Sequence, residues 1–99
     1  MPTLTPLTGA ALSAALARHP GWLISQDGWL CREYHFDDFA QALGWSVTIG
    51  AVAQAIDHHP EITLAWGRVF VRVQTHDVGG LSERDFQFAE RLDAIPKPQ

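Results

Sequence analysis

Three histidines are the residues of this sequence best suited to chemistry. His58 and His59 are adjacent, and His76 follows further along the chain. Histidine is the side chain best able to donate and accept protons near neutral pH, so neighbouring imidazoles can act as a general acid and a general base. The sequence therefore predicts a proton-transfer site, provided that the fold brings the three side chains together.

The segments around the histidines favour such a meeting. The His58-His59 pair precedes a proline and ends a predicted helix, because proline disfavours the α conformation in the residue before it. The pair then leads into a hairpin with predicted strands over residues 62–66 and 69–75, and His76 follows the outgoing strand. Both segments lie at the open end of this hairpin, where we expect the imidazoles to meet.

Two other interpretations of the histidines are open at this point. The adjacent pair can serve as a helix C-terminal cap, with imidazolium groups facing the helix dipole and Asp57 beside them. Three neutral imidazoles can also bind zinc and leave a fourth position for water. Adjacent histidines point in different directions on a regular backbone, however, so we expect no metal.

Asp85 and the tryptophans each allow more than one role. Asp85 follows Ser82 by three residues, which is the spacing of a capping box at a helix N-terminus. Trp22 follows a Pro-Gly break, where an indole can stack on a flat heterocycle at the rim of a site. We expect Trp29 in the core, and the sequence leaves the roles of Trp22, Trp45 and Trp66 open.

The rest of the chain predicts the scaffold that positions these residues. A helix follows Thr8, a helix of about 18 residues follows Asp37 and Asp38, and a last helix follows Ser82. Between them lie two hairpins, the first with strands over 22–25 and 29–36. The order α-β-β-α-β-β-α predicts an α+β two-layer sandwich, in which a four-stranded antiparallel sheet carries the helices on one face.

Side-chain periodicity predicts which faces are buried. In the second hairpin, Val69, Val71 and Val73 lie on one face, which should meet the helices, and the other face carries Phe70, Arg72 and Gln74. In the long helix, three- and four-residue spacing predicts a buried face. Its members are Phe39, Ala42, Leu43, Ser46, Ile49, Ala53 and Ile56.

Length and composition limit the classes of protein to consider. With 99 residues, 46% of them hydrophobic, we expect one domain over residues 8–95 between a mobile segment, 1–7, and a tail, 96–99. The net charge of -4 without a run of basic residues argues against nucleic-acid binding. Cys31 is the single cysteine, and no stretch approaches about 18 consecutive apolar residues. We expect a cytoplasmic protein that does not associate with membranes.

Three segments together resemble the signature of a known family. They are Asp57-His58-His59-Pro60-Glu61, Thr75-His76-Asp77 and Gly80-Leu81-Ser82-Glu83-Arg84-Asp85. In type, order and spacing they are similar to the motifs of pterin-4a-carbinolamine dehydratases, and Gly21-Trp22 and Tyr34-His35-Phe36-Asp37-Asp38-Phe39 add to the likeness. The resemblance covers about residues 8 to 95.

The resemblance implies an activity. Members of the family are hydro-lyases, a class of carbon-oxygen lyases, and dehydrate 4a-hydroxytetrahydrobiopterin to quinonoid dihydrobiopterin. This recycles tetrahydrobiopterin for aromatic amino acid hydroxylases, so a functional link to such a hydroxylase is implied. The elimination delivers one proton to the departing hydroxyl and removes another from the neighbouring ring nitrogen, which suits histidines and implies no cofactor.

The resemblance also assigns roles to residues. It makes His58, His59 and His76 catalytic, around the reactive carbon of the pterin. It assigns to substrate binding the residues Trp22, Gln54, Asp57, Thr75 and Asp85. Many members carry a glutamate where this chain has Gln54, which shares a helical face with His58. Because an amide holds no negative charge, we expect a lower rate here.

Relatives of this fold also suggest a function of another class. Some are non-catalytic binding modules, acting as a transcriptional coactivator or as a Rubisco assembly chaperone. The chaperone type lacks the catalytic histidines, whereas this chain retains all three. The resemblance further implies a homodimer or a homotetramer.

Overall fold

The computed structural model describes residues 4–97. Along the chain it forms α1 (Gly9–Ala17), β1 (Leu23–Ile24), β2 (Leu30–His35), α2 (Phe39–Ile56), β3 (Glu61–Ala65), β4 (Arg68–Val73), the short 3-10 helix η1 (His76–Val78) and α3 (Glu83–Asp93). This order confirms the predicted α-β-β-α-β-β-α arrangement, with η1 as an unpredicted addition before α3.

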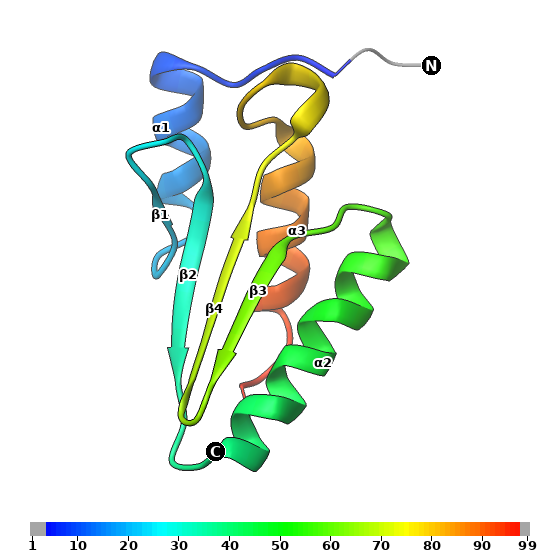
Figure 1. Ribbon diagram of the computed structural model, residues 1–99. Coiled ribbons are helices and arrows are strands. Elements are labelled where there is room, and N and C mark those ends of the chain that lie inside the picture. Colours follow the sequence, from blue (N-terminus) through cyan, green and yellow to red (C-terminus); the bar gives the residue numbers. More distant parts are fainter. Residues whose placement is uncertain (1–3, 98–99) are drawn as a thin grey trace.

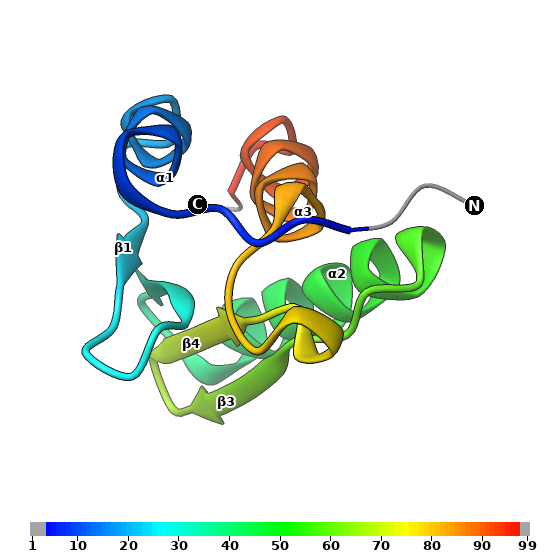
Figure 2. The ribbon, with the colours of Figure 1, turned by 90° about the horizontal axis from the view of Figure 1, so that it is seen from above.

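The four strands form one antiparallel sheet with the order β1-β2-β4-β3. The helices lie on one side of it, so that the predicted two-layer α+β fold is confirmed (Figures 1 and 2). In the hairpin of β3 and β4, Glu61 pairs with Arg72. This register places the start of β3 and the end of β4 at the same edge of the molecule, which is where the histidine-bearing segments begin.

The inner face of the sheet agrees with the predicted alternation. Val69, Val71 and Val73 of β4 are fully buried, and the alternating residues Arg68, Phe70 and Arg72 are exposed or half-buried on the outer face. Together with side chains from the helices, these valines form one core. Its largest fully buried members are Trp45, Phe88, Leu30, Ile49 and Leu92.

The predicted buried face of α2 was partly wrong. The helix buries Ala42, Trp45, Ile49 and Ala53, whereas Phe39 and Leu43 are each 44% exposed. Apolar residues occupy several sides of this helix, so their spacing alone did not fix its rotation. The Trp45 side chain removes more apolar area from water than Leu43 can, and the helix rotates to bury it.

The apolar character of α2 also meets the length and composition of a membrane span, with a mean hydropathy of 1.3 over 18 residues. Such a helix can equally be the core helix of a globular protein. The packing of Trp45 and Ile49 against the sheet side of the core favours the second interpretation.

The expected core position of Trp29 was wrong. Its indole is half-buried on the outer face of the sheet, where the Arg72 guanidinium lies 4.2 Å from the ring centroid. Trp45 and Trp22 are the tryptophans that join the core, and Trp66 is 69% exposed at the turn between β3 and β4. The ring of Trp29 is thus covered by the guanidinium of Arg72 and not by the helices.

Part of the predicted terminal segments lies outside the described residues. These are residues 1–3 of the N-terminal segment and residues 98–99 of the tail. Leu7 donates its backbone N–H to the carbonyl of Leu81 at 2.8 Å and packs against the core. The N-terminal segment is therefore anchored at its inner end, next to the residue that precedes the cap of α3.

Candidate functional site

The C-terminus of α2 sets the direction of His58. Asp57 is the C-cap residue and adopts the left-handed conformation, with φ of 53°. Glycine is usual there, but aspartate tolerates this conformation better than most residues. The backbone N–H of His58 then donates to the carbonyl of Ala53 at 3.0 Å and closes the helix. The capping role suggested for the histidine pair thus falls to the backbone, which leaves the imidazoles available.

The imidazole of His58 turns inward and binds a buried carboxylate. Its Nε2 lies 2.7 Å from Oδ1 of Asp85, and the two side chains are 8% and 0% exposed. Oδ2 of Asp85 accepts hydrogen bonds from the Thr75 hydroxyl at 2.7 Å and from the Ser82 backbone N–H at 2.8 Å. The expected capping box of α3 is therefore present, and the same aspartate also binds the histidine.

The buried network links two segments of the site. Oγ1 of Thr75 and Oγ of Ser82 are 2.6 Å apart, so Thr75 is fixed between Ser82 and Asp85. Thr75 immediately precedes His76, while Asp85 holds His58. The end of β4 and the end of α2 are thereby joined through one carboxylate.

His59 points away from this network. Its Nε2 lies 2.9 Å from Oε1 of Gln54, and its Nδ1 lies 4.0 Å from Oδ1 of Asp57. Gln54 was expected beside His58, one helical turn earlier on the same face. Because the left-handed Asp57 bends the chain, the amide meets His59 instead.

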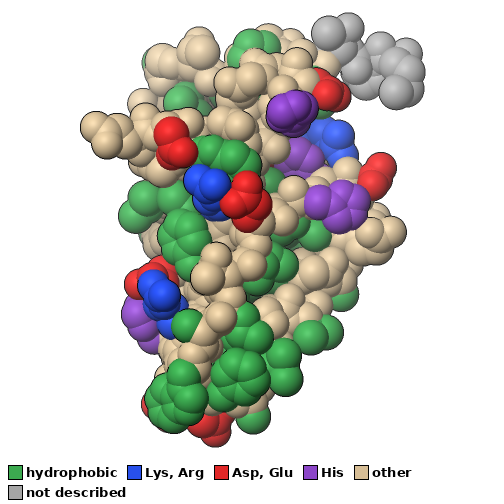
Figure 3. All heavy atoms as spheres, viewed as in Figure 1, with side chains coloured by type: hydrophobic (Ala, Val, Ile, Leu, Met, Phe, Trp, Pro, Cys, Tyr) green, Lys and Arg blue, Asp and Glu red, His purple; other side chains and the backbone are tan. Residues whose placement is uncertain are grey.

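His76 begins η1 and is exposed. Within residues 4–97 its side chain makes no hydrogen bond or ion pair, so both ring nitrogens are available to a ligand. Figure 3 shows histidine side chains gathered on this face of the molecule, beside acidic and basic groups. The three predicted histidines therefore share one end of the hairpin, with one imidazole buried and two at the surface.

Trp22 has contacts in another part of the molecule. Its Nε1 donates to Oδ1 of Asp93 at 2.9 Å, and its ring packs edge-on against Phe88. Asp93 lies at the C-terminal end of α3, about 12 Å along the helix from Asp85 at a rise of about 1.5 Å per residue. Within residues 4–97, no hydrogen bond or ring contact joins Trp22 to His58, His59 or His76, and its role in substrate binding stays a prediction.

Arg84 is a residue of the site that the sequence did not single out. Its guanidinium donates to the backbone carbonyl of Asp57 at 2.5 Å and approaches that of Ile56 at 3.4 Å. Both carbonyls belong to the last turn of α2, whose acceptors have no partner within the helix. Because Arg84 and Asp85 are neighbours on α3, one turn of α3 holds both the backbone before His58 and its imidazole.

Metal ligation is not built into the described residues. Within residues 4–97, no group of three or more His, Cys, Asp or Glu side chains is arranged to hold an ion. Cys31 lies in β2 and its Sγ donates to the carbonyl of Leu23, while burial raises the pKa of its thiol.

Comparison with known proteins points to one family. The family model described as pterin 4 alpha carbinolamine dehydratase matches residues 5–95. A protein of Rhodospirillum rubrum is 42% identical over 90% of this chain and 94% of its own length. One of Paracoccus denitrificans is 43% identical over 89% of this chain and 83% of its own length. Both carry a provisional assignment as pterin-4-alpha-carbinolamine dehydratases.

Solved structures give the same answer for the fold. A protein of Brucella melitensis, described as a transcriptional coactivator/pterin dehydratase, superposes with a TM-score of 0.84 at 32% identity, covering 91% of this chain and 97% of that one. A pterin dehydratase-like protein described as a RuBisCO assembly factor of the α-carboxysome has a TM-score of 0.62 at 23% identity, over 77% of this chain and 89% of that one. The second likeness concerns the fold alone. The family model covers residues 5–95, and the proteins of Rhodospirillum rubrum, Paracoccus denitrificans and Brucella melitensis are each more than 30% identical to this chain over most of its length. The chain therefore belongs to the pterin 4 alpha carbinolamine dehydratase family.

Proposed function

We propose that this protein dehydrates 4a-hydroxytetrahydropterin to the quinonoid dihydropterin by histidine acid-base catalysis. The observation that carries the proposal is the buried hydrogen bond between His58 and Asp85. It lies at the end of the β3-β4 hairpin where the exposed His59 and His76 also lie. The proposal includes a cytoplasmic location and a link to an aromatic amino acid hydroxylase, which would supply the substrate.

His58 is assigned as the general base. An ionised carboxylate only accepts hydrogen bonds, so Asp85 requires the proton of His58 on Nε2 and leaves the lone pair on Nδ1. When Nδ1 takes a proton, the resulting imidazolium lies against the carboxylate at 2.7 Å, which stabilises the charge. This arrangement resembles the His-Asp pair of hydrolytic triads, where the aspartate orients and stabilises the imidazole.

His76 is assigned as the general acid. Its exposed ring has no partner among residues 4–97, so it can carry two protons and present one to the departing oxygen. His59 is held by Gln54 through Nε2, which suits it to orienting the substrate. The assignment gives each histidine a distinct task.

The proposed elimination transfers two protons and releases one water. The acid gives a proton to the 4a-hydroxyl, the carbon-oxygen bond breaks, and water leaves. The lone pair of the neighbouring ring nitrogen forms a carbon-nitrogen double bond, and the base removes the proton from that nitrogen. No electron enters or leaves the system, so no redox partner is required.

Dehydration of 4a-hydroxypterin generated in place by a hydroxylase is the direct test. We expect the wild-type protein to accelerate the reaction above its spontaneous rate, and His58→Gln and His76→Gln each to lower kcat at least about 10²-fold. Asp85→Asn should lower kcat as well, while the charge-matched change Glu83→Gln on the same helix should not. If wild-type protein gives no acceleration, the enzyme assignment fails.

A binding module is the alternative in that case. The observation that favours it is the apolar stripe on the outer side of α2, where Phe39, Leu43 and Val47 are 44%, 44% and 64% exposed. Such a stripe suits a protein partner. Variants distinguish the two functions. An enzyme loses activity when His58 is replaced and tolerates changes in the stripe, whereas a binding module loses partner binding when the stripe is changed and tolerates replacement of His58.

A further inference from the structure

Two neighbouring cavities whose linings include none of His58, His59 and His76 lie beside α3. Arg18 and Asp93 line both of them. Asp93 is already bound by three donors: His19 at 3.2 Å, and Trp22 and Arg32 at 2.9 Å each. Its carboxylate is therefore already paired and organises the wall between the cavities.

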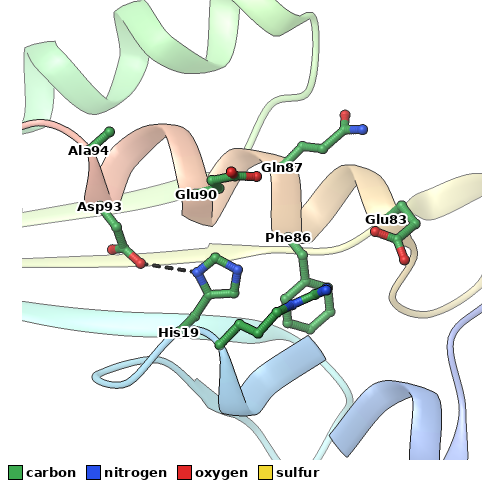
Figure 4. Close-up of a pocket in the computed structure, with 8 residues that line it drawn as sticks. His19, Glu83, Phe86, Gln87, Glu90, Asp93 and Ala94 are labelled. Carbon is green, nitrogen blue, oxygen red and sulfur yellow. Dashed lines mark hydrogen bonds and ion pairs between the residues drawn. The ribbon is translucent and has the colours of Figure 1, made fainter. Parts of the chain in front are cut away.

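The first cavity is acidic. Besides Arg18 and Asp93 it is lined by Glu83 and Glu90 of α3, with His19 and Phe86 on its floor (Figure 4). Three carboxylates face one cationic side chain, so an anion is disfavoured there.

The second cavity has the opposite charge. Its volume is about 470 Å³, within the range of small-molecule sites. It is lined by Arg18, Arg32 and Lys97 against the single, already paired Asp93. These are three of the seven Lys and Arg residues of a chain whose net charge is -4. The positive charge is thus concentrated at one place in an acidic protein.

The three cationic side chains differ in the contacts that they already make with the protein. Arg32 donates to Asp93 and lies 4.7 Å from the centroid of the Tyr34 ring. Lys97 donates to the backbone carbonyl of His35 at 2.9 Å. The Arg18 side chain makes no hydrogen bond or ion pair with residues 4–97, and it is exposed. Arg18 and Lys97 therefore keep donors for a ligand.

Two buried polar groups belong to the wall of the same cavity. The Tyr34 hydroxyl and the Trp45 indole N–H are buried, and neither makes a hydrogen bond of good geometry within residues 4–97, although the indole lies close enough to the phenol oxygen to lower its pKa. Burial raises the pKa of the Tyr34 phenol, so it remains a neutral donor at physiological pH. Both polar atoms are sealed from solvent, so the wall of the cavity presents the two rings and not these donors.

The remaining lining is apolar. Pro20, Leu92, Ile95 and Pro96 join the rings of Tyr34 and Trp45. An apolar surface beside a few polar donors and cations is typical of sites for small organic molecules.

We propose that the second cavity binds a small organic anion, a carboxylate attached to an aromatic or apolar body. The carboxylate pairs with Arg18 and Lys97, and the body packs on the apolar wall. The site shares no residue with the histidine constellation, so the proposal stands independently of the dehydratase function.

NMR of the nitrogen-labelled protein can test this, because the Trp45 indole N–H reports on the cavity and the exposed Trp66 serves as an internal reference. The probe is 3-phenylpropanoate, with the uncharged 3-phenylpropanamide as its matched control. We expect the carboxylate to shift the Trp45 resonance saturably, with a dissociation constant on the order of 1 mM. The amide and inorganic phosphate alone should bind much more weakly.

Charge variants localise the effect. Arg18→Gln and Lys97→Gln should each weaken binding about two- to fivefold, and Arg91→Gln, with the same charge change outside this cavity, should leave it unchanged. The proposal is overturned if the carboxylate gives no saturable shift, if the amide or phosphate binds equally well, or if Arg91→Gln weakens binding as much as the other two.

Discussion

At the scale of single residues, Asp85 combines two roles that a sequence presents as alternatives. Its Oδ2 completes the capping box of α3 through the Ser82 N–H, and its Oδ1 binds His58. A carboxylate has about four acceptor positions, so helix capping and histidine orientation do not compete. Full burial raises the importance of each bond, because an unpaired carboxylate in this place would be strongly destabilising.

Gln54 allows the sharpest test of the surface histidines. We expect Gln54→Glu to raise kcat about two- to fivefold, because the hydrogen bond between the side chain at position 54 and His59 becomes charge-assisted. The gain is modest because solvent partly screens this exposed pair. Steady-state dehydration kinetics measure this change, with Gln87→Glu on α3 as the control for net charge. An equal or lower kcat would show that the carboxylate has no role in this chain.

Tyr34 gives a prediction about pH. It is the only tyrosine, and burial raises the pKa of its phenol; the Asp93 carboxylate adds to the rise, while the positive charge of Arg32 opposes it. A raised pKa in the folded state stabilises the protein fully below the ordinary tyrosine value of about 10, and this contribution is lost as pH rises above it. Tyr34→Phe should therefore reduce the alkaline loss of stability.

Denaturant unfolding on both sides of pH ~10 measures this difference. At neutral pH, Tyr34→Phe should change the free energy of unfolding by less than about 1 kcal/mol, since the hydroxyl makes no hydrogen bond of good geometry within residues 4–97. The phenolate absorbance of the wild type should rise only above the ordinary pKa of tyrosine. A normal titration would contradict the prediction.

At the scale of elements, the sequence was sufficient for the helix caps and for the order of helices and strands along the chain, but not for the order of strands across the sheet or for helix rotation. Asp38 and Ser82 cap their helices as predicted, because capping depends on side chains within one turn. The rotation of α2 depends instead on which apolar side chains fit against the sheet. The spacing of apolar residues does not tell whether Trp45 or Leu43 is the one that is buried. In the same way, Arg84 reaches α2 only through the fold.

Arg84 should act as a positioning residue for the histidine segment. Arg84→Met removes the donors to the last carbonyls of α2, and we expect a loss of about 1 kcal/mol in unfolding free energy. Because the left-handed Asp57 loses its support, kcat should fall more than KM rises. Arg84→Lys should recover part of kcat.

Steady-state kinetics and denaturant unfolding of both variants measure these effects. Arg91→Met on the same helix is the matched control and should change kcat little. If Arg84→Met lowers stability while kcat and KM stay at wild-type values, the arginine supports only the fold.

At the scale of the whole molecule, the functional features are separated in space. The histidine constellation lies at the open end of the β3-β4 hairpin, and the basic cavity lies beside the C-terminal residues that follow α3. The outer side of α2 forms a third region, where Phe39, Leu43 and Val47 follow one another at four-residue spacing and are exposed. An apolar stripe of this kind on one helix is suited to a matching helix.

We propose that this stripe mediates self-association, through a second copy of the chain that covers it with its own α2. Val47→Glu places a charge at its most exposed position and should shift the protein toward the monomer in light scattering, since an unpaired charge is disfavoured in an apolar contact. Thr63→Glu, on an exposed position of β3, is the control. Neither variant touches the core, so both should unfold close to the wild-type midpoint. A wild-type protein that is monomeric at all concentrations would refute the proposal, and so would a Val47→Glu variant that associates as strongly as Thr63→Glu.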